Sequence, residues 1–326
     1  MITSIALYQG VTHDPHYNLA VEQHLLETVK EGQCILYLWQ NQNTVVIGRN
    51  QNPWKECKTT LLQQEGGKLA RRLSGGGAVF HDLGNLNFTF LMPQTDYDLD
   101  RQLTVIQTAV RSLGIDAQRS GRNDILAEGR KFSGNAFYKN GKQAYHHGTL
   151  LVNADMEKLG RYLSPSKAKL QSKGVDSVRS RVVNLKEFAP ELTIGKLQSA
   201  LIDAFSQVYA LPVEQIQESQ LDLQRIQALA ARNAGWEWNY GQKLPFTWEY
   251  ETRFPWGSVL VQLQAERGMI CQAKVYSDAM DAFLASHWEQ KLTGCPLDSQ
   301  ALLSRLNRQD IPEEQDFCQM LIQNLI

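Results

Sequence analysis

The residues best suited to chemistry lie in a basic, glycine-rich segment in the first third of the chain. Residues 71–82 read Arg-Arg-Leu-Ser-Gly-Gly-Gly-Ala-Val-Phe-His-Asp. Three successive glycines carry no side chains, so main-chain N–H groups can approach a ligand closely and point into one concavity. The adjacent arginines add donors that suit phosphate or carboxylate. The segment is predicted to bind an anion; the simpler alternative is a flexible loop with a solvated basic rim.

The spacing of this segment excludes two common nucleotide-binding motifs. It is not the GxxxxGK[ST] of a P-loop, and it lacks the GxGxxG of a dinucleotide-binding fold. Any nucleotide site here must therefore belong to a different class of fold.

A second polar group follows in the sequence GRNDILAEGRKFSGNA, residues 121–136. Strand side chains alternate in direction, so Lys131, Ser133 and Asn135 are predicted to share one face of a strand, apart from any bulge at Gly134. Phe132 and Ala136 would then fall on the other face. A lysine projecting beside small polar residues can hold the α-phosphate of a nucleotide. The alternative is a solvent-facing lysine of the kind that edge strands favour.

Two further features have weaker functional interpretations. His146 and His147 are neighbours on a predicted strand and point to opposite faces, so no metal-binding pair is proposed; one is expected to be packed and the other to lie near a site. Residues 167–181 carry five cationic residues among serines and glycine. They are interpreted as a mobile loop that closes over an anionic nucleotide, or as an ordinary solvated loop.

Composition limits the class of protein. The 326 residues carry 33 Lys and Arg against 34 Asp and Glu, a net charge of −1 that argues against a dedicated nucleic-acid binder. The sequence contains no apolar run of membrane-spanning length and no signal-peptide pattern. The five cysteines are scattered, which disfavours a disulfide framework or a zinc site. A cytoplasmic protein, monomeric and without a membrane or nucleic-acid partner, is expected.

Hydrophobic spacing predicts the elements that must position these residues. Asp14-Pro15 is typical of a helix start, and Asn140-Gly141 of the turn of a hairpin. The predicted strands are Ile2–Tyr8, Cys34–Trp39, Thr44–Ile47, Asn87–Leu91, Lys131–Lys139 and Gln143–Val152, and the predicted helices include Leu103–Leu113 and Leu221–Ala231.

Two domains are predicted. Residues 1–242 would form an α/β-type domain around a mixed sheet, and residues 243–326 a small accessory α+β domain, which makes the chain α+β in class. The aromatic segment after residue 236 indicates a linker that extends to Lys243-Leu244-Pro245. Beyond it, alternating apolar residues and the turn Glu266-Arg267-Gly268 predict a second hairpin.

Together these segments resemble the lipoate–protein ligase A family. The resemblance rests on the order of TVVIGRNQNPWKEC (44–57), RRLSGGGAVFHDLGNLNFTF (71–90), GRNDI (121–125), RKFSGNA (130–136), HHGTLL (146–151), SKGVDSVRSRVVNL (172–185) and WEWNYGQ (236–242). Each motif is weak alone, but their order and spacing together are specific, and the similarity extends over the whole chain.

The resemblance implies a catalytic fold related to biotin–protein ligases and class II aminoacyl-tRNA synthetases, and a reaction in two halves. Lipoate would attack the α-phosphorus of ATP and give lipoyl-AMP and pyrophosphate, with Mg²⁺ sharing the phosphate charge. A lysine of an acceptor protein would then take the lipoyl group. The implied acceptors are lipoyl domains of 2-oxoacid dehydrogenase complexes and the glycine-cleavage H protein.

The resemblance also assigns residues. Lys131 is expected to be catalytic and to contact both the α-phosphate and the lipoyl carbonyl. The expected ATP contacts are Arg72, Gly77, Ala78, Val79, Phe80 and Lys131, and the expected lipoate contacts are Ser74, Gly75, Gly76 and Lys131. Trp39 and Val45 are weaker candidates for the wall of the lipoyl pocket, and Asp124 could orient a lysine or form a structural salt bridge. No protein ligand for a metal is assigned.

Three other functions remain open. An octanoyl- or lipoyl-transferase of the same superfamily would need a nucleophilic cysteine in the site, and none of the five lies in the three motif segments at 71–82, 121–136 and 167–181. Biotin ligation is possible on the same fold. A non-catalytic acyl-binding protein would be expected to have lost Arg72 or Lys131, and both are present.

Overall fold

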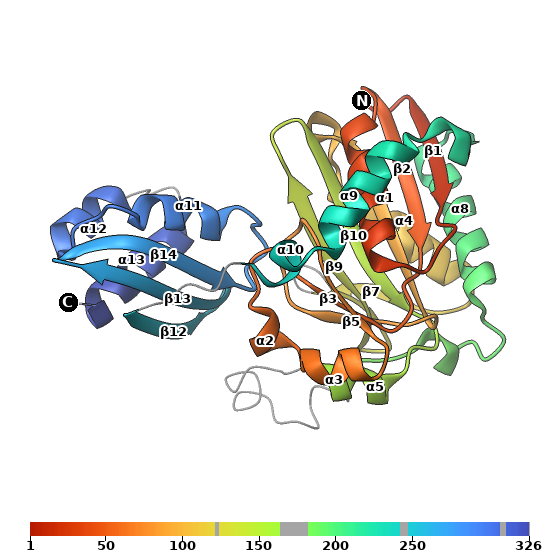
Figure 1. The fold of residues 1–326 in the computed structure, drawn as a ribbon. Coiled ribbons are helices and arrows are strands. Elements are labelled where there is room, and N and C mark those ends of the chain that lie inside the picture. The colour runs from red at the N-terminus through yellow and green to blue at the C-terminus, as the bar shows by residue number, and fades with distance from the viewer. Residues whose placement is uncertain (121–123, 164–181, 242–246, 307–310, 326) are drawn as a thin grey trace.

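A computed structural model describes residues 1–120, 124–163, 182–241, 247–306 and 311–325, and Figure 1 shows them as a larger and a smaller body. The predicted closing loop at 167–181, the first residues of GRNDI and the predicted boundary at 242–243 lie outside the described residues. That boundary therefore stays a prediction. Among the described residues, none of the helices has the length and apolar character needed to cross a bilayer.

The larger body alternates strands and helices. Its elements are β1 (Ser4–Gln9), α1 (Pro15–Thr28), β2 (Gln33–Trp39), β3 (Thr44–Ile47), α2 (Pro53–Glu56), α3 (Thr59–Gln64), β4 (Lys68–Arg71), β5 (Val79–His81), β6 (Asn85–Pro93), α4 (Leu99–Ser112), β7 (Ala117–Ser120), β8 (Asp124–Ala127), β9 (Arg130–Lys139), β10 (Gln143–Leu151), α5 (Met156–Tyr162), α8 (Ile194–Tyr209), β11 (Val213–Gln215), α9 (Leu223–Ala234) and α10 (Trp236–Tyr240).

An eight-stranded mixed sheet, in the order β11-β1-β2-β6-β10-β9-β8-β7, forms the centre of this body. Only β11, β1 and β2 are parallel neighbours; from β2 to β7 the pairs are antiparallel. Alternate side chains of its strands pack on opposite faces. One face meets α4 and α8, and the other meets α1 and α9.

Local sequence explains where these elements begin and turn. Asp14 caps α1, because its carboxylate accepts from the N–H groups of His16 and Tyr17, and Pro15 occupies the first turn. The hairpin between β9 and β10 turns at Gly141, whose φ of 91° suits glycine. The predicted strands and helices are therefore confirmed, with small shifts at their ends.

A second, three-stranded sheet in the order β4-β3-β5 lies on the α1 side of the large sheet. It carries the glycine-rich residues in the connection from β4 to β5. The two sheets thus hold the predicted anion-binding segment opposite β9 and β10, the strands that carry Lys131 and His147.

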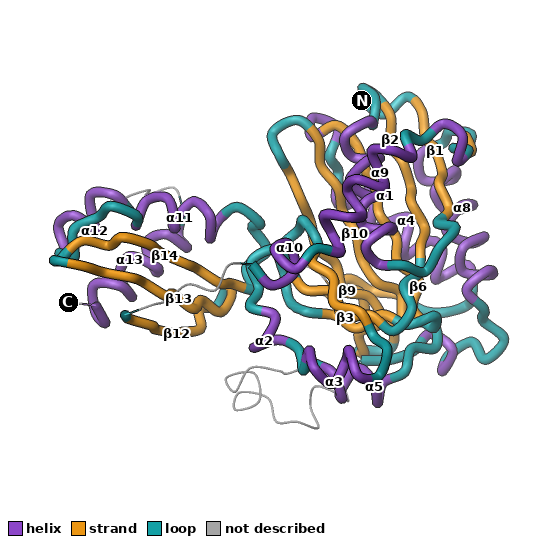
Figure 2. The backbone as a smooth tube through the Cα atoms, viewed as in Figure 1, coloured by secondary structure: helices purple, strands orange, loops and turns teal. Residues whose placement is uncertain are grey.

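The smaller body has its own core. Its elements are β12 (Trp248–Phe254), β13 (Gly257–Glu266), β14 (Met269–Ser277), α11 (Leu284–Leu292), α12 (Ser299–Arg305) and α13 (Pro312–Leu325). The three strands form one antiparallel sheet, separate from the others in Figure 2. Val261, Trp288 and Phe317 are completely buried between this sheet and the helices. The predicted second hairpin is β13–β14, and the α+β class is confirmed.

The first residues of the segment predicted as a linker form a short helix. Trp236–Tyr240 forms α10, and the Arg71 side chain donates to the carbonyls of Trp238 at 2.9 Å and Asn239 at 2.5 Å. The same guanidinium donates to the carbonyls of Gly48, Arg49 and Gln51. This buried arginine therefore fixes α10 to the larger body.

Candidate active site

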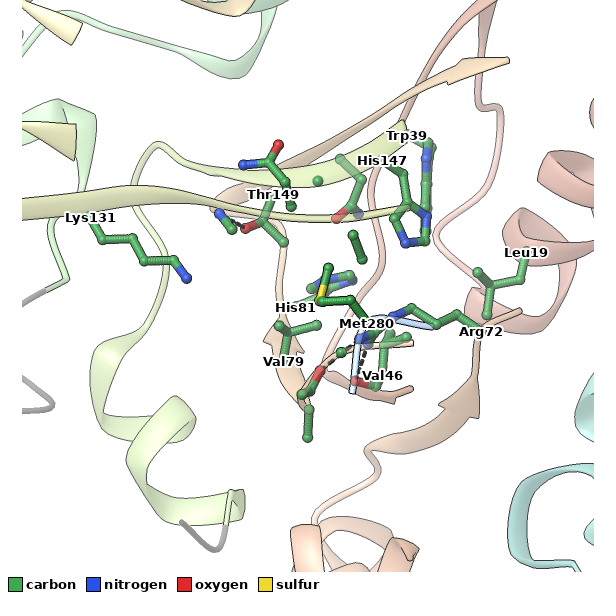
Figure 3. Close-up of a pocket in the computed structure, with 18 residues that line it drawn as sticks. Leu19, Trp39, Val46, Arg72, Val79, His81, Lys131, His147, Thr149 and Met280 are labelled. Carbon is green, nitrogen blue, oxygen red and sulfur yellow. Dashed lines mark hydrogen bonds between the residues drawn. The ribbon is translucent and has the colours of Figure 1, made fainter. Parts of the chain in front are cut away.

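A cavity of about 290 Å³ lies between the large sheet and the small sheet. Figure 3 shows Lys131 and Arg72 on opposite sides of it, and Trp39 and His147 also border it. Its lining residues are Leu19, Trp39, Val46, Arg72, Gly76, Gly77, Ala78, Val79, His81, Asn87, Lys131, Gly134, Asn135, Ala136, His147, Gly148, Thr149 and Met280.

Lys131 is placed to act on a ligand. Its side chain is 35% exposed, and its ammonium lies 2.6 Å from the Asp124 carboxylate on the neighbouring strand. A Cβ at Gly134 would lie 3.0 Å from the Lys131 Nζ, so the missing side chain of this glycine leaves room for the lysine. Asp124 thus pairs with Lys131, which fits either of the two roles considered for this carboxylate, and the ammonium faces the cavity.

A β-bulge changes which residues share a face with Lys131. On β8, Ile125 pairs with Ser133 and the next residue pairs with Lys131, which leaves Phe132 as the extra residue in β9. Ser133 and the side-chain amide of Asn135 therefore lie on the α4 side, where the amide reaches His146, although Asn135 also borders the cavity. Lys131 and Ala136 face the cavity. The predicted grouping of Lys131 with Ser133 and Asn135 was wrong, because the bulge interrupts the alternation.

The glycine loop, residues 75–77, is closely packed. Gly76 has a φ of 87°, which favours glycine. A Cβ at Gly75 would lie 2.3 Å from the Ala279 carbonyl oxygen, so only glycine fits beneath the smaller body. The Gly76 N–H donates to that same carbonyl at 2.9 Å. The smaller body therefore contacts the loop directly, and its Met280 completes the cavity wall.

Arg72 is buried and holds the glycine loop from within. Its Nη2 donates to the carbonyls of Gly75 at 2.7 Å and Gly77 at 2.8 Å. Its Nη1 donates to the Val46 carbonyl at 3.2 Å, and its Nε to the Ser74 hydroxyl at 3.0 Å. Burial lowers the pKa of this guanidinium to about 10, so it remains charged at neutral pH.

A hydrogen-bonded chain continues from Arg72 behind the cavity wall. The Ser74 hydroxyl lies 2.8 Å from Nε2 of His147, and Nδ1 of His147 lies 2.8 Å from the buried Glu22 carboxylate. Glu22 also accepts from the Thr89 hydroxyl at 2.7 Å. The order Ser–His–Glu is that of hydrolytic triads, but Ser74 is fully buried and its oxygen accepts from Arg72. A substrate carbonyl cannot reach it in this arrangement.

The two histidines separate as predicted. His147 lines the cavity, whereas His146 is fully buried between Asn135, 2.8 Å from its Nε2, and Gln102, 3.1 Å from its Nδ1. Burial lowers the pKa of His146 to about 3, so it is neutral at physiological pH. His146 therefore supports the core, and His147 belongs to the site.

The predicted site residues divide into two groups. Those that line the cavity are Trp39, Arg72, Gly76, Gly77, Ala78, Val79 and Lys131. Those that do not line it are Val45, Ser74, Gly75 and Phe80. Val45 and Phe80 are buried in a separate apolar cluster, where the Phe80 ring lies 5.4 Å from that of Tyr162. The roles of all these residues in binding remain predictions.

Sequence reasoning left several residues of the site unassigned, and two of them, Glu22 and Met280, show why. Glu22 lies within a helical stretch, and an acidic residue there normally indicates a solvated position; the apolar residues Ala20 and Val21 beside it were the available signal. Met280 comes from the smaller body, and nothing in its local sequence links it to residues 200 positions earlier. Both depend on tertiary contacts.

The cysteines do not offer a nucleophile to this cavity. All five lie in described residues, and none lines it. Burial raises the pKa of the Cys34 and Cys57 thiols to about 12, which keeps them protonated and weakly nucleophilic. The polar groups that line the cavity include the Lys131 ammonium and the His147 imidazole, beside the apolar surface of Leu19, Trp39 and Val46.

Family models match both parts of the chain. Residues 14–206 match the lipoyl protein ligase A/B catalytic domain, and residues 243–326 match the bacterial lipoate protein ligase C-terminus. The lipoate-protein ligase A of Psychrobacter cryohalolentis is 42% identical over 315 residues, which cover 93% of each protein.

Solved structures agree with these matches. The LipL1 protein of P. falciparum in complex with lipoate superposes with a TM-score of 0.86 at 27% identity, covering 98% of this chain and 99% of that one. A lipoate-protein ligase A bound with ATP gives 0.62 at 26% identity, covering 74% and 99%. The bipartite ligase of Thermoplasma acidophilum, studied with its E2 lipoyl domain, gives 0.63 at 27% identity, covering 75% and 99%. The chain belongs to the lipoate–protein ligase A family.

Proposed function

We propose that this protein activates lipoate with ATP and transfers the lipoyl group to a lysine of an acceptor protein. The observation that carries the proposal is the arrangement of one cavity. A lysine ammonium faces a glycine loop across it, and an aromatic and apolar wall lies alongside. The cavity thus offers a cation for phosphate and carboxylate and an apolar surface for an acyl tail.

In the first half of the reaction, the lipoate carboxylate attacks the α-phosphorus of ATP and pyrophosphate leaves. Two anions must meet, and negative charge builds on the phosphoryl oxygens. Lys131 supplies the cation at this point, and the main chain of residues 77–80 supplies N–H donors. Leu19 and Trp39 receive the apolar tail of lipoate.

Magnesium would arrive with the triphosphate. Among the described residues, the cavity is lined by no aspartate or glutamate, so these lining residues offer Mg²⁺ no carboxylate ligand. The ion neutralises phosphate charge when bound, and the protein's own part is to orient the nucleotide and the lipoate carboxylate.

In the second half, the acceptor lysine amine attacks the carbonyl of lipoyl-AMP and AMP leaves. The acceptors are lipoyl domains of 2-oxoacid dehydrogenase complexes and the glycine-cleavage H protein. The first class is supported by the Thermoplasma acidophilum ligase, which was studied with its E2 lipoyl domain. The enzyme works as a monomer in the cytoplasm.

The test is pyrophosphate release from ATP, measured with and without lipoate, followed by transfer to a purified lipoyl domain. We expect release to depend on lipoate and the domain to gain one lipoyl group. Octanoate replaces lipoate in a parallel reaction to define the acyl preference. Acyl transfer from an acyl carrier protein without ATP would instead establish the transferase function.

A further inference from the structure

Among the described residues of the larger body, Glu22 is the buried carboxylate, and it lies behind the cavity wall. The Glu22 side chain, on α1, is 2% exposed and does not line the cavity. The Trp39 indole donates to the Thr89 hydroxyl at 3.1 Å, and that hydroxyl donates to Glu22. A buried carboxylate is costly unless it is paired and hydrogen-bonded, so this position needs a physical reason.

The balancing charge is Arg72. The two side chains are joined through His147 and Ser74. Burial lowers the pKa of the Arg72 guanidinium, and the electrostatic effects of Tyr145 and Glu22 oppose this change. With the imidazole proton on Nδ1, facing Glu22, the Ser74 hydroxyl donates to Nε2 and accepts from Arg72. Each bond of the chain then has one donor and one acceptor.

Arg72 has little capacity left for a ligand. Its guanidinium donates to Ser74 and to the carbonyls of Val46, Gly75 and Gly77. These bonds fix the carbonyls, and therefore the directions of the N–H groups, in the loop that faces Lys131. The conformation of the loop thus depends on where Arg72 is held.

We propose that Glu22 and Ser74 are positioning residues for the ATP site, which act through His147 and Arg72 on the glycine loop. The inference rests on the proposed function for the identity of the ligand. Its consequence is specific: a change at Glu22, on the side of the cavity lined by Trp39 and His147, weakens ATP binding at the loop.

The experiment measures the dissociation constant for ATP alone, without lipoate, in wild type, Glu22→Gln, Ser74→Ala and the double variant. Glu22→Gln keeps size and removes the charge, and Ser74→Ala removes one oxygen. We expect each single change to weaken ATP binding about tenfold, within the range of coupling between linked sites. Because the residues act in series, the double variant should be no weaker than the weaker single variant.

Glu27→Gln is the matched control, since Glu27 lies on the same helix but pairs with Arg225 at the surface. A purely structural role would reduce the folded fraction without changing the ATP dissociation constant of the folded protein, so thermal unfolding is measured in parallel. Unchanged ATP affinity in both single variants, or losses that multiply in the double variant, would overturn the coupling. A wild-type protein that bound no ATP would instead refute the proposed function, and the coupling with it.

Discussion

Lys131 and Arg72 face the same cavity from opposite sides, yet the protein holds them in opposite ways. Lys131 is about one third exposed, pairs with Asp124 and ends in an ammonium that can turn toward a ligand. Arg72 is 6% exposed and donates to carbonyls on both sides of the glycine loop. An ammonium on a flexible stem adapts to changing charge, whereas a planar guanidinium suits a fixed set of acceptors. The first side chain is therefore suited to chemistry and the second to architecture.

The largest expected effect is the loss of adenylate formation when Lys131 is replaced. Lys131→Ala should fold with an unchanged melting temperature but lose adenylate formation by about 10²–10³-fold, because the developing phosphoryl charge loses its cation. Lipoate-dependent pyrophosphate release measures this. Lys139→Ala on the same strand is the control, since Lys139 lies over the Tyr97 ring and away from the cavity. If Lys131→Ala released pyrophosphate at nearly the wild-type rate, Lys131 would not be the catalytic cation, and its contrast with Arg72 would fail.

Replacing Arg72 should lower the free energy of unfolding. Arg72→Met leaves the carbonyls of Val46, Gly75 and Gly77 without their donor, and each unsatisfied buried group costs about 1–3 kcal/mol. We expect the free energy of unfolding to fall by about 3 kcal/mol in all, because the relaxed loop recovers some bonds. Urea unfolding measures the change. A variant as stable as wild type but unable to bind ATP would show that Arg72 contacts the nucleotide directly.

A smaller effect is expected at Gly76, where the loop meets Arg72. Alanine there must adopt a φ of 87° and places its Cβ 3.0 Å from Nη2 of Arg72. Gly114→Ala is the matched control, since its φ is 82° and its Cβ would meet nothing within 4 Å. The positive φ costs both variants about 1–2 kcal/mol of unfolding free energy. Only Gly76→Ala should also weaken ATP binding, and equal ATP affinities would show that the loop tolerates displacement.

The smallest effect is expected at the cysteines. Replacing each of the five by alanine should leave lipoyl transfer intact in the folded protein, because an acyl-adenylate requires no thioester. Gel-based lipoylation of a lipoyl domain checks this, with thermal unfolding to correct for lost packing at the buried positions. A cysteine whose loss stopped transfer while pyrophosphate release continued would indicate a covalent acyl intermediate.

The part of this site that sequence could predict is the part with local signals. The glycine run, the hairpin turn at Asn140-Gly141 and the strand position of Lys131 each follow from neighbouring residues. Glu22 could not be assigned, because its burial depends on Thr89 and His147, which lie far along the chain. Ser74 was predicted beside lipoate, but it does not line the cavity, and its hydroxyl lies 2.8 Å from Nε2 of His147. This contact joins positions 73 residues apart, which local sequence does not predict.

The bulge in β9 has a consequence for how insertions and deletions would act. Phe132 is one residue more than β8 can pair with, and this surplus residue turns Lys131 from the helix-covered side of the sheet to the open side. The number of residues in β9 therefore decides which face of the sheet carries position 131, and the lysine at that position supplies the cation. Removing Arg130 would restore even pairing, would place Lys131 opposite Ala127, and would point the lysine into the apolar interior. A change in the length of this strand would therefore move the Lys131 side chain to the other face of the sheet, an effect that a substitution at a single position does not produce.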